Sequence, residues 1–294
     1  MSIFKGCATA IVTPFDPSNK INFTAFKKLV DFQIENGVNA LVFLGTTGEA
    51  STLTEKEKLQ VAKFAVSYVK GRVPVILGAG GNNTEEVIAR SKKFAKLGAD
   101  ALLQITPYYN KCTQEGLVQH FTAIAMACPD TPQILYNVPS RTGVNMLPAT
   151  LQKLAEVPNI VGIKEAGGNV QELARVLPED FDIFSGEDEQ VFSTLALGGS
   201  GVISVVSNVA PAQTSALCNA FFEGNIELAR KIQFELVPLI RALFNEVNPI
   251  PVKAALNLLC FNVGTPRLPL TSATEETTEK LRDLLTGDFS THIQ

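Results

Sequence analysis

The 294-residue sequence contains no tryptophan and only two histidines, His120 and His292. A Ser-His-Asp triad would have to use His120, because only two residues follow His292. A metal site built from several histidines, such as an HExxH zinc site, is excluded for the same reason, and we expect no bound metal. Acid–base chemistry in this protein must therefore depend on tyrosine, lysine, cysteine or carboxylate side chains.

Cysteine pairs, long apolar runs and an excess of one charge are also missing. The five cysteines are scattered and no two form a CxxC motif, so we expect reduced thiols rather than a zinc ribbon or a disulfide framework. No apolar stretch approaches the roughly 20 residues of a membrane-spanning helix, and the N-terminus lacks the pattern of a signal peptide. The net charge is −4 with interspersed charges, which favours neither nucleic-acid nor membrane binding. We expect a soluble, cytoplasmic protein.

Short apolar runs recur along the first two thirds of the chain, with amphipathic segments between them. The eight runs are 8–12, 40–44, 73–77, 101–105, 133–136, 160–163, 181–184 and 201–205. They are continuous rather than alternating, which is typical of parallel strands covered on both faces. Eight such units within about 210 residues predict a (β/α)8 TIM barrel of the α/β class.

The organisation of the chain follows from the same pattern. No further strand pattern occurs after residue 209, so we predict a barrel over residues 1–209 and a C-terminal helical region over residues 210–294. Thr24, Thr54 and Thr84 are candidate N-caps of the first three helices. A doubly wound sheet is the alternative fold, but residues 78–83 lack the final glycine of a GxGxxG dinucleotide motif.

Lys164 is the most informative residue. It ends the apolar run 159–164, and a Gly pair follows it within residues 165–168. Burying an ammonium group is costly unless it is paired or loses its proton, and a neutral lysine amine is a nucleophile towards carbonyls. Taken alone, a strand lysine more often reaches solvent or pairs with a neighbour such as Glu165.

Residues 45–49, which follow the second strand, form a turn with two hydroxyl groups, those of Thr46 and Thr47. Catalytic groups of (β/α)8 barrels lie at the C-terminal ends of the strands. Hydroxyls and backbone N–H groups in such a turn suit a carboxylate or a phosphate. Alone, an ordinary threonine-stabilised turn is the more frequent explanation.

Aromatic and cationic residues follow two further strands. Tyr108 and Tyr109 come after the fourth strand, Tyr136 ends the fifth, and Arg141 lies in the next loop. A phenol can relay protons, and an arginine can hold a carboxylate with two hydrogen bonds. Each of these residues alone is at least as often an interface anchor, a core tyrosine or part of a surface ion pair.

Together these groups predict a Schiff-base site on one rim of the barrel. Lys164 would attack a keto acid, and the iminium would act as an electron sink for the loss of an adjacent proton. Tyr136 would shuttle protons, and the turn at Thr46 and Thr47 would hold the carboxylate of the keto acid. Such a site needs no cofactor.

Motifs along nearly the whole chain, in order, resemble the 4-hydroxy-tetrahydrodipicolinate synthase (dihydrodipicolinate synthase) family, related to N-acetylneuraminate lyase. They are residues 45–49, 106–110, 136–143, 162–165, 201–205 and 248–253. The resemblance implies that Lys164 forms an imine with pyruvate. The derived enamine then attacks L-aspartate 4-semialdehyde, and the adduct cyclises on the route to lysine and diaminopimelate.

The resemblance also implies roles for individual residues. Thr46, Tyr109 and Tyr136 match a proton relay, in which Tyr109 reaches into the site of a neighbouring subunit. The family is typically a homotetramer, a dimer of dimers, and we expect the same assembly here.

Substrate contacts are implied in the same way. Thr47 and Ile203 match pyruvate-contacting positions, Gly186 lies near the pocket, and Arg141 matches the residue that binds the semialdehyde carboxylate. N-acetylneuraminate lyase and 2-keto-3-deoxygluconate aldolase share the lysine and tyrosine but take neutral polyol aldehydes. Arg141 favours the synthase, because only a carboxylate-bearing aldehyde needs a cation.

Feedback inhibition by lysine is a further property of some members of this family. Their effector site matches Ala50, Ser51, Glu55, Lys58, Asn82, Glu86 and Tyr108. Lys58 and Glu55 depart from the regulated pattern, and Lys58 places a positive charge near the ammonium group of the effector. We therefore expect weak or absent inhibition.

Three rival functions come from other classes. A pyridoxal-phosphate barrel also uses a strand-end lysine, but only residues 198–201 suggest a phosphate cradle. A metal-dependent aldolase would need histidine ligands that the sequence lacks. A non-catalytic binding or transcription-linked role would tolerate loss of Lys164, and no basic segment supports it.

Overall fold

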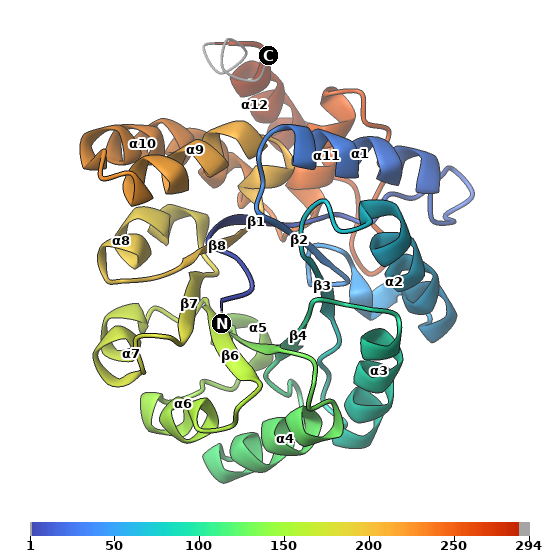
Figure 1. The fold of residues 1–294 in the computed structure, drawn as a ribbon. Helices are drawn as coiled ribbons and strands as arrows, with labels where there is room; N and C mark the ends of the chain where they lie inside the picture. Colours follow the sequence, from blue (N-terminus) through green and yellow to red (C-terminus); the bar gives the residue numbers. More distant parts are fainter. Residues whose placement is uncertain (1, 288–294) are drawn as a thin grey trace.

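The computed structural model describes residues 2–287, and within them eight parallel strands close into a barrel (Figure 1). The strands are β1 (Gly6–Ala10), β2 (Ala40–Phe43), β3 (Val75–Gly78), β4 (Ala101–Ile105), β5 (Gln133–Asn137), β6 (Ile160–Glu165), β7 (Asp182–Ser185) and β8 (Gly201–Ser204). Each pairs with its neighbours in sequence, and β8 pairs with β1. The predicted (β/α)8 barrel is confirmed, and the doubly wound alternative is wrong.

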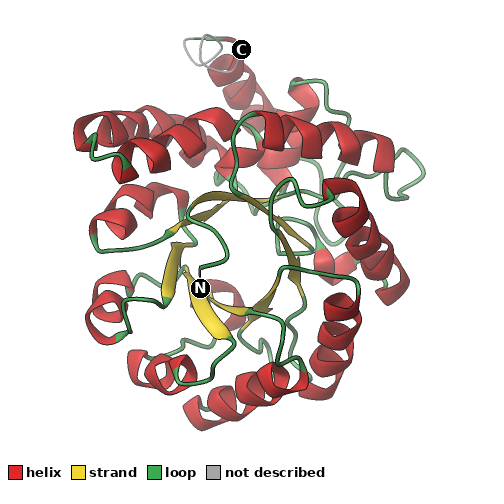
Figure 2. Cartoon of the chain, viewed as in Figure 1, coloured by secondary structure: helices red, strands yellow, loops and turns green. Residues whose placement is uncertain are grey.

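Helices surround the barrel on its outside (Figure 2). Those that follow the strands are α1 (Phe23–Glu35), α2 (Glu55–Val69), α3 (Thr84–Lys96), α4 (Gln114–Ala127), α5 (Pro139–Thr142), α6 (Pro148–Ala155), α7 (Val170–Val176), α8 (Val191–Ala196) and α9 (Pro211–Phe222). Short 3-10 turns are η1 (Ala50–Thr52), η2 (Asp188–Gln190) and η3 (Val206–Asn208). The strands are buried on both faces, as continuous apolar runs require.

Strand register decides which strand-end side chains become neighbours. In the β5–β6 pair, Tyr136 lies opposite Lys164, and in the β4–β5 pair, Ile105 lies opposite Tyr136. On the other side of β6, Lys164 lies opposite Phe184 of β7. The C-terminal ends of these strands therefore bring the predicted amine and phenol together.

The predicted helix caps are correct in one case of three. Thr54 caps α2 in a capping box with Glu57, as expected. The predictions for Thr24 and Thr84 are wrong, because Asn22 caps α1 and Asn83 caps α3 through their side-chain oxygens. Asparagine is at least as good an N-cap as threonine, and each asparagine precedes the threonine in sequence.

The C-terminal helices α10 (Ile226–Leu243), α11 (Ile250–Leu258) and α12 (Glu275–Thr286) follow α9. Leu236, Leu256 and Leu281 belong to the same apolar core cluster as Ile11 and Leu41 of the barrel. In Figure 1 these helices lie against one side of the barrel rather than apart from it. The division at residues 209 and 210 stays a prediction, and residues 288–294 lie outside the described part.

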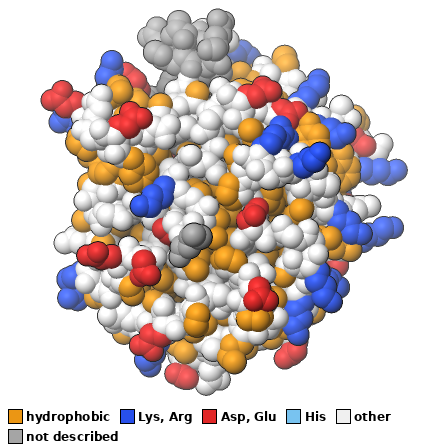
Figure 3. Space-filling view, in the orientation of Figure 1, with side chains coloured by type: hydrophobic (Ala, Val, Ile, Leu, Met, Phe, Trp, Pro, Cys, Tyr) orange, Lys and Arg blue, Asp and Glu red, His pale blue; other side chains and the backbone are white. Residues whose placement is uncertain are grey.

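Figure 3 shows acidic and basic side chains scattered together over one face of the molecule, in keeping with the small net charge. Among the described residues, no helix is both long enough and apolar enough to cross a membrane.

Candidate active site

Lys164 lies within the barrel, near the C-terminal end of β6. Only 5% of the residue is exposed, and its Nζ lies 4.6 Å from the centre of the Tyr136 ring. Burial lowers the pKa of Lys164 to about 8, the negative charges of Asp188 and Glu187 oppose this shift, and Arg141 adds to it. Roughly a tenth of such amines are neutral at pH 7, against fewer than about one in a thousand for a free lysine. The site therefore supplies a nucleophilic amine.

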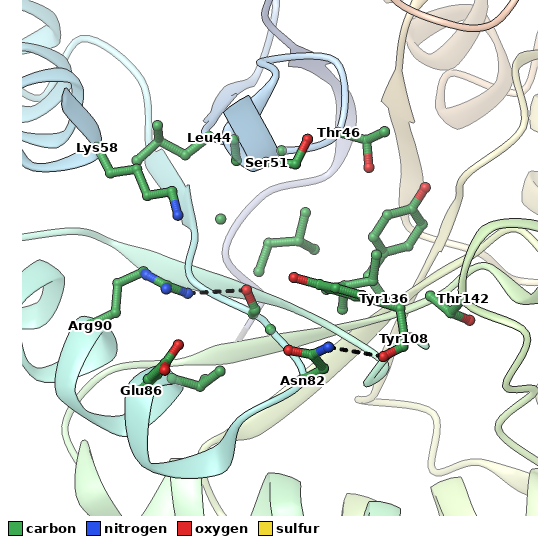
Figure 4. Close-up of a pocket in the computed structure, with 18 of the residues that line it drawn as sticks. Leu44, Thr46, Ser51, Lys58, Asn82, Glu86, Arg90, Tyr108, Tyr136 and Thr142 are labelled. Atoms are coloured by element: carbon green, nitrogen blue, oxygen red, sulfur yellow. Dashed lines mark hydrogen bonds between the residues drawn. The ribbon is translucent and has the colours of Figure 1, made fainter. Parts of the chain in front are cut away.

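Tyr136 supplies a phenol beside that amine. Burial raises its pKa to about 12, while the positive charge of Arg141 and a hydrogen bond with the Thr46 side chain act in the opposite direction. The phenol is thus protonated at neutral pH and can give a proton and recover it through Thr46. In Figure 4, Tyr136 and Thr46 lie on the same side of the pocket drawn.

A cavity of about 170 Å³ opens beside Lys164. The predicted site residues Thr46, Thr47, Tyr136, Arg141, Lys164 and Gly186 all line it. Val205, Asn248, Phe244 and Glu187 are among the other residues of its wall. The cavity has the volume for a small keto acid and combines a nucleophile, a proton carrier and hydroxyl groups.

Thr47 and Arg141 provide two places for carboxylate groups. Thr47 is buried, and its Oγ1 accepts a hydrogen bond of 2.9 Å from Nδ2 of Asn248, which leaves the hydroxyl proton free for an acceptor in the cavity. Arg141, on the short helix α5, is exposed and donates a 3.4 Å hydrogen bond to the backbone oxygen of Asn248. The two groups can hold two different carboxylates at the same time.

Three predicted residues occupy different surroundings. Gly186 lines the cavity, and close packing leaves no space for a side chain there, because a Cβ would lie 2.7 Å from Cβ of Ala166. Ile203 is fully buried in the barrel core and is not among the residues that line the cavity, where Val205 stands instead. Tyr109 is 91% exposed and adopts a left-handed φ of 72°, so its ring lies outside the cavity in the single chain.

All but Glu55 of the residues that match an effector site line a second pocket of about 340 Å³ (Figure 4). They are Ala50, Ser51, Lys58, Asn82, Glu86 and Tyr108. Nδ2 of Asn82 donates to the backbone oxygen of Tyr108 at 3.1 Å. Glu55 pairs with Lys58 at 2.8 Å and with Arg90 at 3.0 Å, and both cations line the pocket. Thr46, Tyr136 and Arg141 line it as well, so it borders the first cavity.

Sequence reasoning missed several residues near Lys164. Asp188 is buried and accepts hydrogen bonds from the backbone N–H groups of Val205 and Val206, both at 3.0 Å. Burial raises the pKa of Asp188, and Glu187 beside it is also shifted upwards by burial. The acidic run directly after β7 was the available signal for these two carboxylates.

Among the described residues, no group of three or more histidine, cysteine or carboxylate side chains is arranged to hold a metal ion. His120 lies on α4 and is not among the residues that line the cavity, and its Nδ1 is 2.9 Å from Oγ1 of Thr84. His292 lies outside the described residues.

Known proteins are similar to this chain over nearly its whole length. Residues 3–287 match the model of the dihydrodipicolinate synthetase family. The 4-hydroxy-tetrahydrodipicolinate synthase of Alkaliphilus oremlandii is 53% identical over 284 residues, covering 96% of this chain and 97% of that protein.

Solved structures of dihydrodipicolinate synthases are similar to this chain in fold. The dihydrodipicolinate synthase of Thermotoga maritima superposes with a TM-score of 0.94 at 47% identity, covering 97% of this chain and 98% of that one. The enzyme of Acinetobacter baumannii, solved in complex with pyruvate, has a TM-score of 0.93 at 44% identity, with 96% and 98% covered. This chain therefore belongs to the dihydrodipicolinate synthetase family.

Proposed function

We propose that this protein is a 4-hydroxy-tetrahydrodipicolinate synthase, which condenses pyruvate with L-aspartate 4-semialdehyde in lysine and diaminopimelate biosynthesis. The observation that carries the proposal is the buried amine of Lys164, 4.6 Å from the Tyr136 ring in a cavity also lined by Thr47 and Arg141. Full-length relatives with this activity support it, as does the pyruvate complex of the Acinetobacter baumannii enzyme.

The reaction begins on Lys164. Its neutral amine attacks the keto carbon of pyruvate, and loss of water gives an imine. The protonated imine draws electrons from the methyl group, which loses a proton to give an enamine. The enamine carbon then attacks the aldehyde carbon, and a proton reaches the new alkoxide.

Product release regenerates the lysine. The amino group of the adduct attacks the imine carbon, the ring closes, and the Lys164 amine leaves. Tyr136, beside the Lys164 amine, and its hydrogen-bond partner Thr46 would move the protons in these steps. Thr47 would hold the pyruvate carboxylate and Arg141 the carboxylate of the semialdehyde.

Tyr109 supports a multi-subunit enzyme. Its exposed ring, on backbone held in a left-handed conformation, projects from the chain instead of packing on it. A second copy would cover this ring and receive it as the third member of the relay with Thr46 and Tyr136. We therefore propose the homotetramer, a dimer of dimers. A cytoplasmic location, which the scattered cysteines favour, likewise stays a prediction.

Replacing Arg141 with alanine tests both the function and the choice of aldehyde. We expect the KM for L-aspartate 4-semialdehyde to rise at least about tenfold, because a charge-assisted carboxylate contact is lost, while the KM for pyruvate changes little. Condensation of pyruvate with neutral D-glyceraldehyde, the substrate type of the sibling aldolases, should be slow in both proteins. Equal loss for both substrates would contradict the role of Arg141, and faster turnover of glyceraldehyde by the unaltered protein would favour an aldolase.

Feedback inhibition by lysine should be weak or absent. Lys58 and Arg90 both line the pocket that matches the effector site, and together they oppose binding of an ammonium group. A titration of the condensation rate with L-lysine should show less than half inhibition at about 1 mM, an affinity that corresponds to weak binding. Half inhibition at micromolar lysine would show that Glu55 and Glu86 outweigh these two cations.

A further inference from the structure

The turn that carries Thr46 and Thr47 is attached to a distant part of the chain by a buried ion pair. Glu49, at the end of this turn, and Lys253, on α11, are each about 1% exposed at their side chains. Oε1 of Glu49 lies 2.5 Å from Nζ of Lys253, and Oε2 accepts a 2.8 Å hydrogen bond from the backbone N–H of Arg267. The imine chemistry described above uses neither side chain.

A second contact joins the same two segments. Asn248 lies two residues before α11, and its Nδ2 donates to Oγ1 of Thr47 at 2.9 Å. Residues 248–253 thus touch the turn at two points, at Thr47 through Asn248 and at Glu49 through Lys253. Glu49 itself adopts a left-handed φ of 54°, so the turn is held in a conformation that a non-glycine residue seldom takes.

Lys253 has two further contacts besides Glu49. Its Nζ lies 4.1 Å from the centre of the Phe15 ring and donates a long 3.4 Å hydrogen bond to the backbone oxygen of Thr265. A buried ion pair is weak evidence for stability, because apolar side chains of similar volume can do as well. Its directional contacts hold the Glu49 carboxylate against Lys253 and the backbone of Arg267.

We propose that Glu49, Lys253 and Asn248 are positioning residues, which hold the turn so that the Thr47 hydroxyl and neighbouring N–H groups meet the carboxylate of the keto acid. Asn248 occupies an acceptor position of Thr47 Oγ1 and so directs the hydroxyl proton into the cavity. The C-terminal helical region thereby completes the binding site of the barrel. This inference rests on the proposed imine between Lys164 and pyruvate.

The test compares two ketones that differ only in the carboxylate. Pyruvate and acetone both form an imine with a lysine amine, but only pyruvate can use the turn. Each is incubated with the full-length protein and cyanoborohydride, and the reduced adduct on the peptide containing Lys164 is quantified by mass spectrometry. The aldehyde substrate is absent, so the result does not depend on the condensation step.

The principal variant is the double substitution Glu49→Gln with Lys253→Met, which removes both buried charges and keeps the link from residue 49 to Arg267. We expect pyruvate trapping at Lys164 to fall at least about tenfold at subsaturating pyruvate, with acetone trapping within about twofold, because small displacements of binding groups are costly. Asn248→Ala should likewise lower the trapping of pyruvate and leave the trapping of acetone nearly unchanged. The exposed pair Lys231–Glu235 on α10, 3.7 Å apart, is the matched control. Lys231→Met with Glu235→Gln should leave the trapping of both ketones at Lys164 unchanged.

The outcomes of this test support or overturn the positioning role as follows. Unchanged pyruvate trapping, or equal loss of both ketones, in a folded double variant would overturn the positioning role. If the double variant does not fold, Asn248→Ala decides by the same comparison, since it leaves the ion pair intact. If the unaltered protein gives no pyruvate adduct at Lys164, the proposed function fails and not merely this inference.

Discussion

Replacing Lys164 with methionine is expected to lower kcat by about 10³-fold or more, because no other described side chain in the cavity is an amine that can form the imine. The substituted side chain has a similar length and no charge, so it fills the same space and removes the cost of burying the amine. The fold should therefore survive, with a melting temperature equal to or above that of the unaltered protein. A coupled rate assay and a thermal melt provide the two readings.

Lys153→Met on α6 is the matched control for this substitution, since Lys153 is exposed and its loss should leave the rate unchanged. Residual activity of Lys164→Met above about one per cent of the original would contradict an obligatory imine. A collapse of the fold would also be informative, because it would show that the amine is charged and paired in the resting protein.

Replacing Tyr136 with phenylalanine is expected to have the second large effect on the rate. We expect kcat to fall by about 10²–10⁴-fold, the usual contribution of a positioned proton donor and acceptor. The ring that packs against Nζ of Lys164 is retained, so the loss should reflect the hydroxyl group and its hydrogen bond with Thr46.

The separation of kcat from KM tests this interpretation of Tyr136. Pyruvate should still bind through Thr47, so its KM should change by less than about threefold while kcat falls. Thr46→Val, which removes the next hydroxyl of the relay, should lower kcat in the same direction. A Tyr136→Phe enzyme with unaltered kcat would show that water or another group moves the proton.

The sequence predicted the parts of this site that depend on the repeating strand pattern. Once the eight apolar runs are aligned as consecutive parallel strands, Tyr136 and Lys164 must lie side by side at one rim. The turn at Thr46 and the loop at Arg141 follow strands of the same barrel, so they reach the same cavity. Local periodicity and the rule that catalytic groups follow strand ends suffice for these residues.

Other parts depend on contacts between segments far apart in sequence, which no local pattern contains. Asn248 bonds to Thr47 across 201 positions, and Lys253 reaches Glu49 from a helix that the strand pattern does not place. Ile203 is a residue whose strand the sequence did predict. It lies on β8 as expected and is buried inside the barrel, while Val205, two residues later, lines the cavity, so its contact with pyruvate stays a prediction.

Helix starts were harder to predict than helix positions. Two N-cap asparagines, Asn22 and Asn83, lie close before threonines that could serve equally well, and the choice depends on backbone angles outside the helix. Tyr109 is a different case, because its exposure has a function only if a second subunit covers it.

Trapping of the imine on the unaltered protein tests the central claim most directly. The protein is treated with borohydride in the presence and in the absence of pyruvate, digested, and mapped by mass spectrometry. We predict one reduced pyruvate unit per chain, located on Lys164, with parallel loss of activity only when pyruvate is present. An unchanged mass, or a modification on a different lysine, would contradict the assignment of Lys164 as the nucleophile.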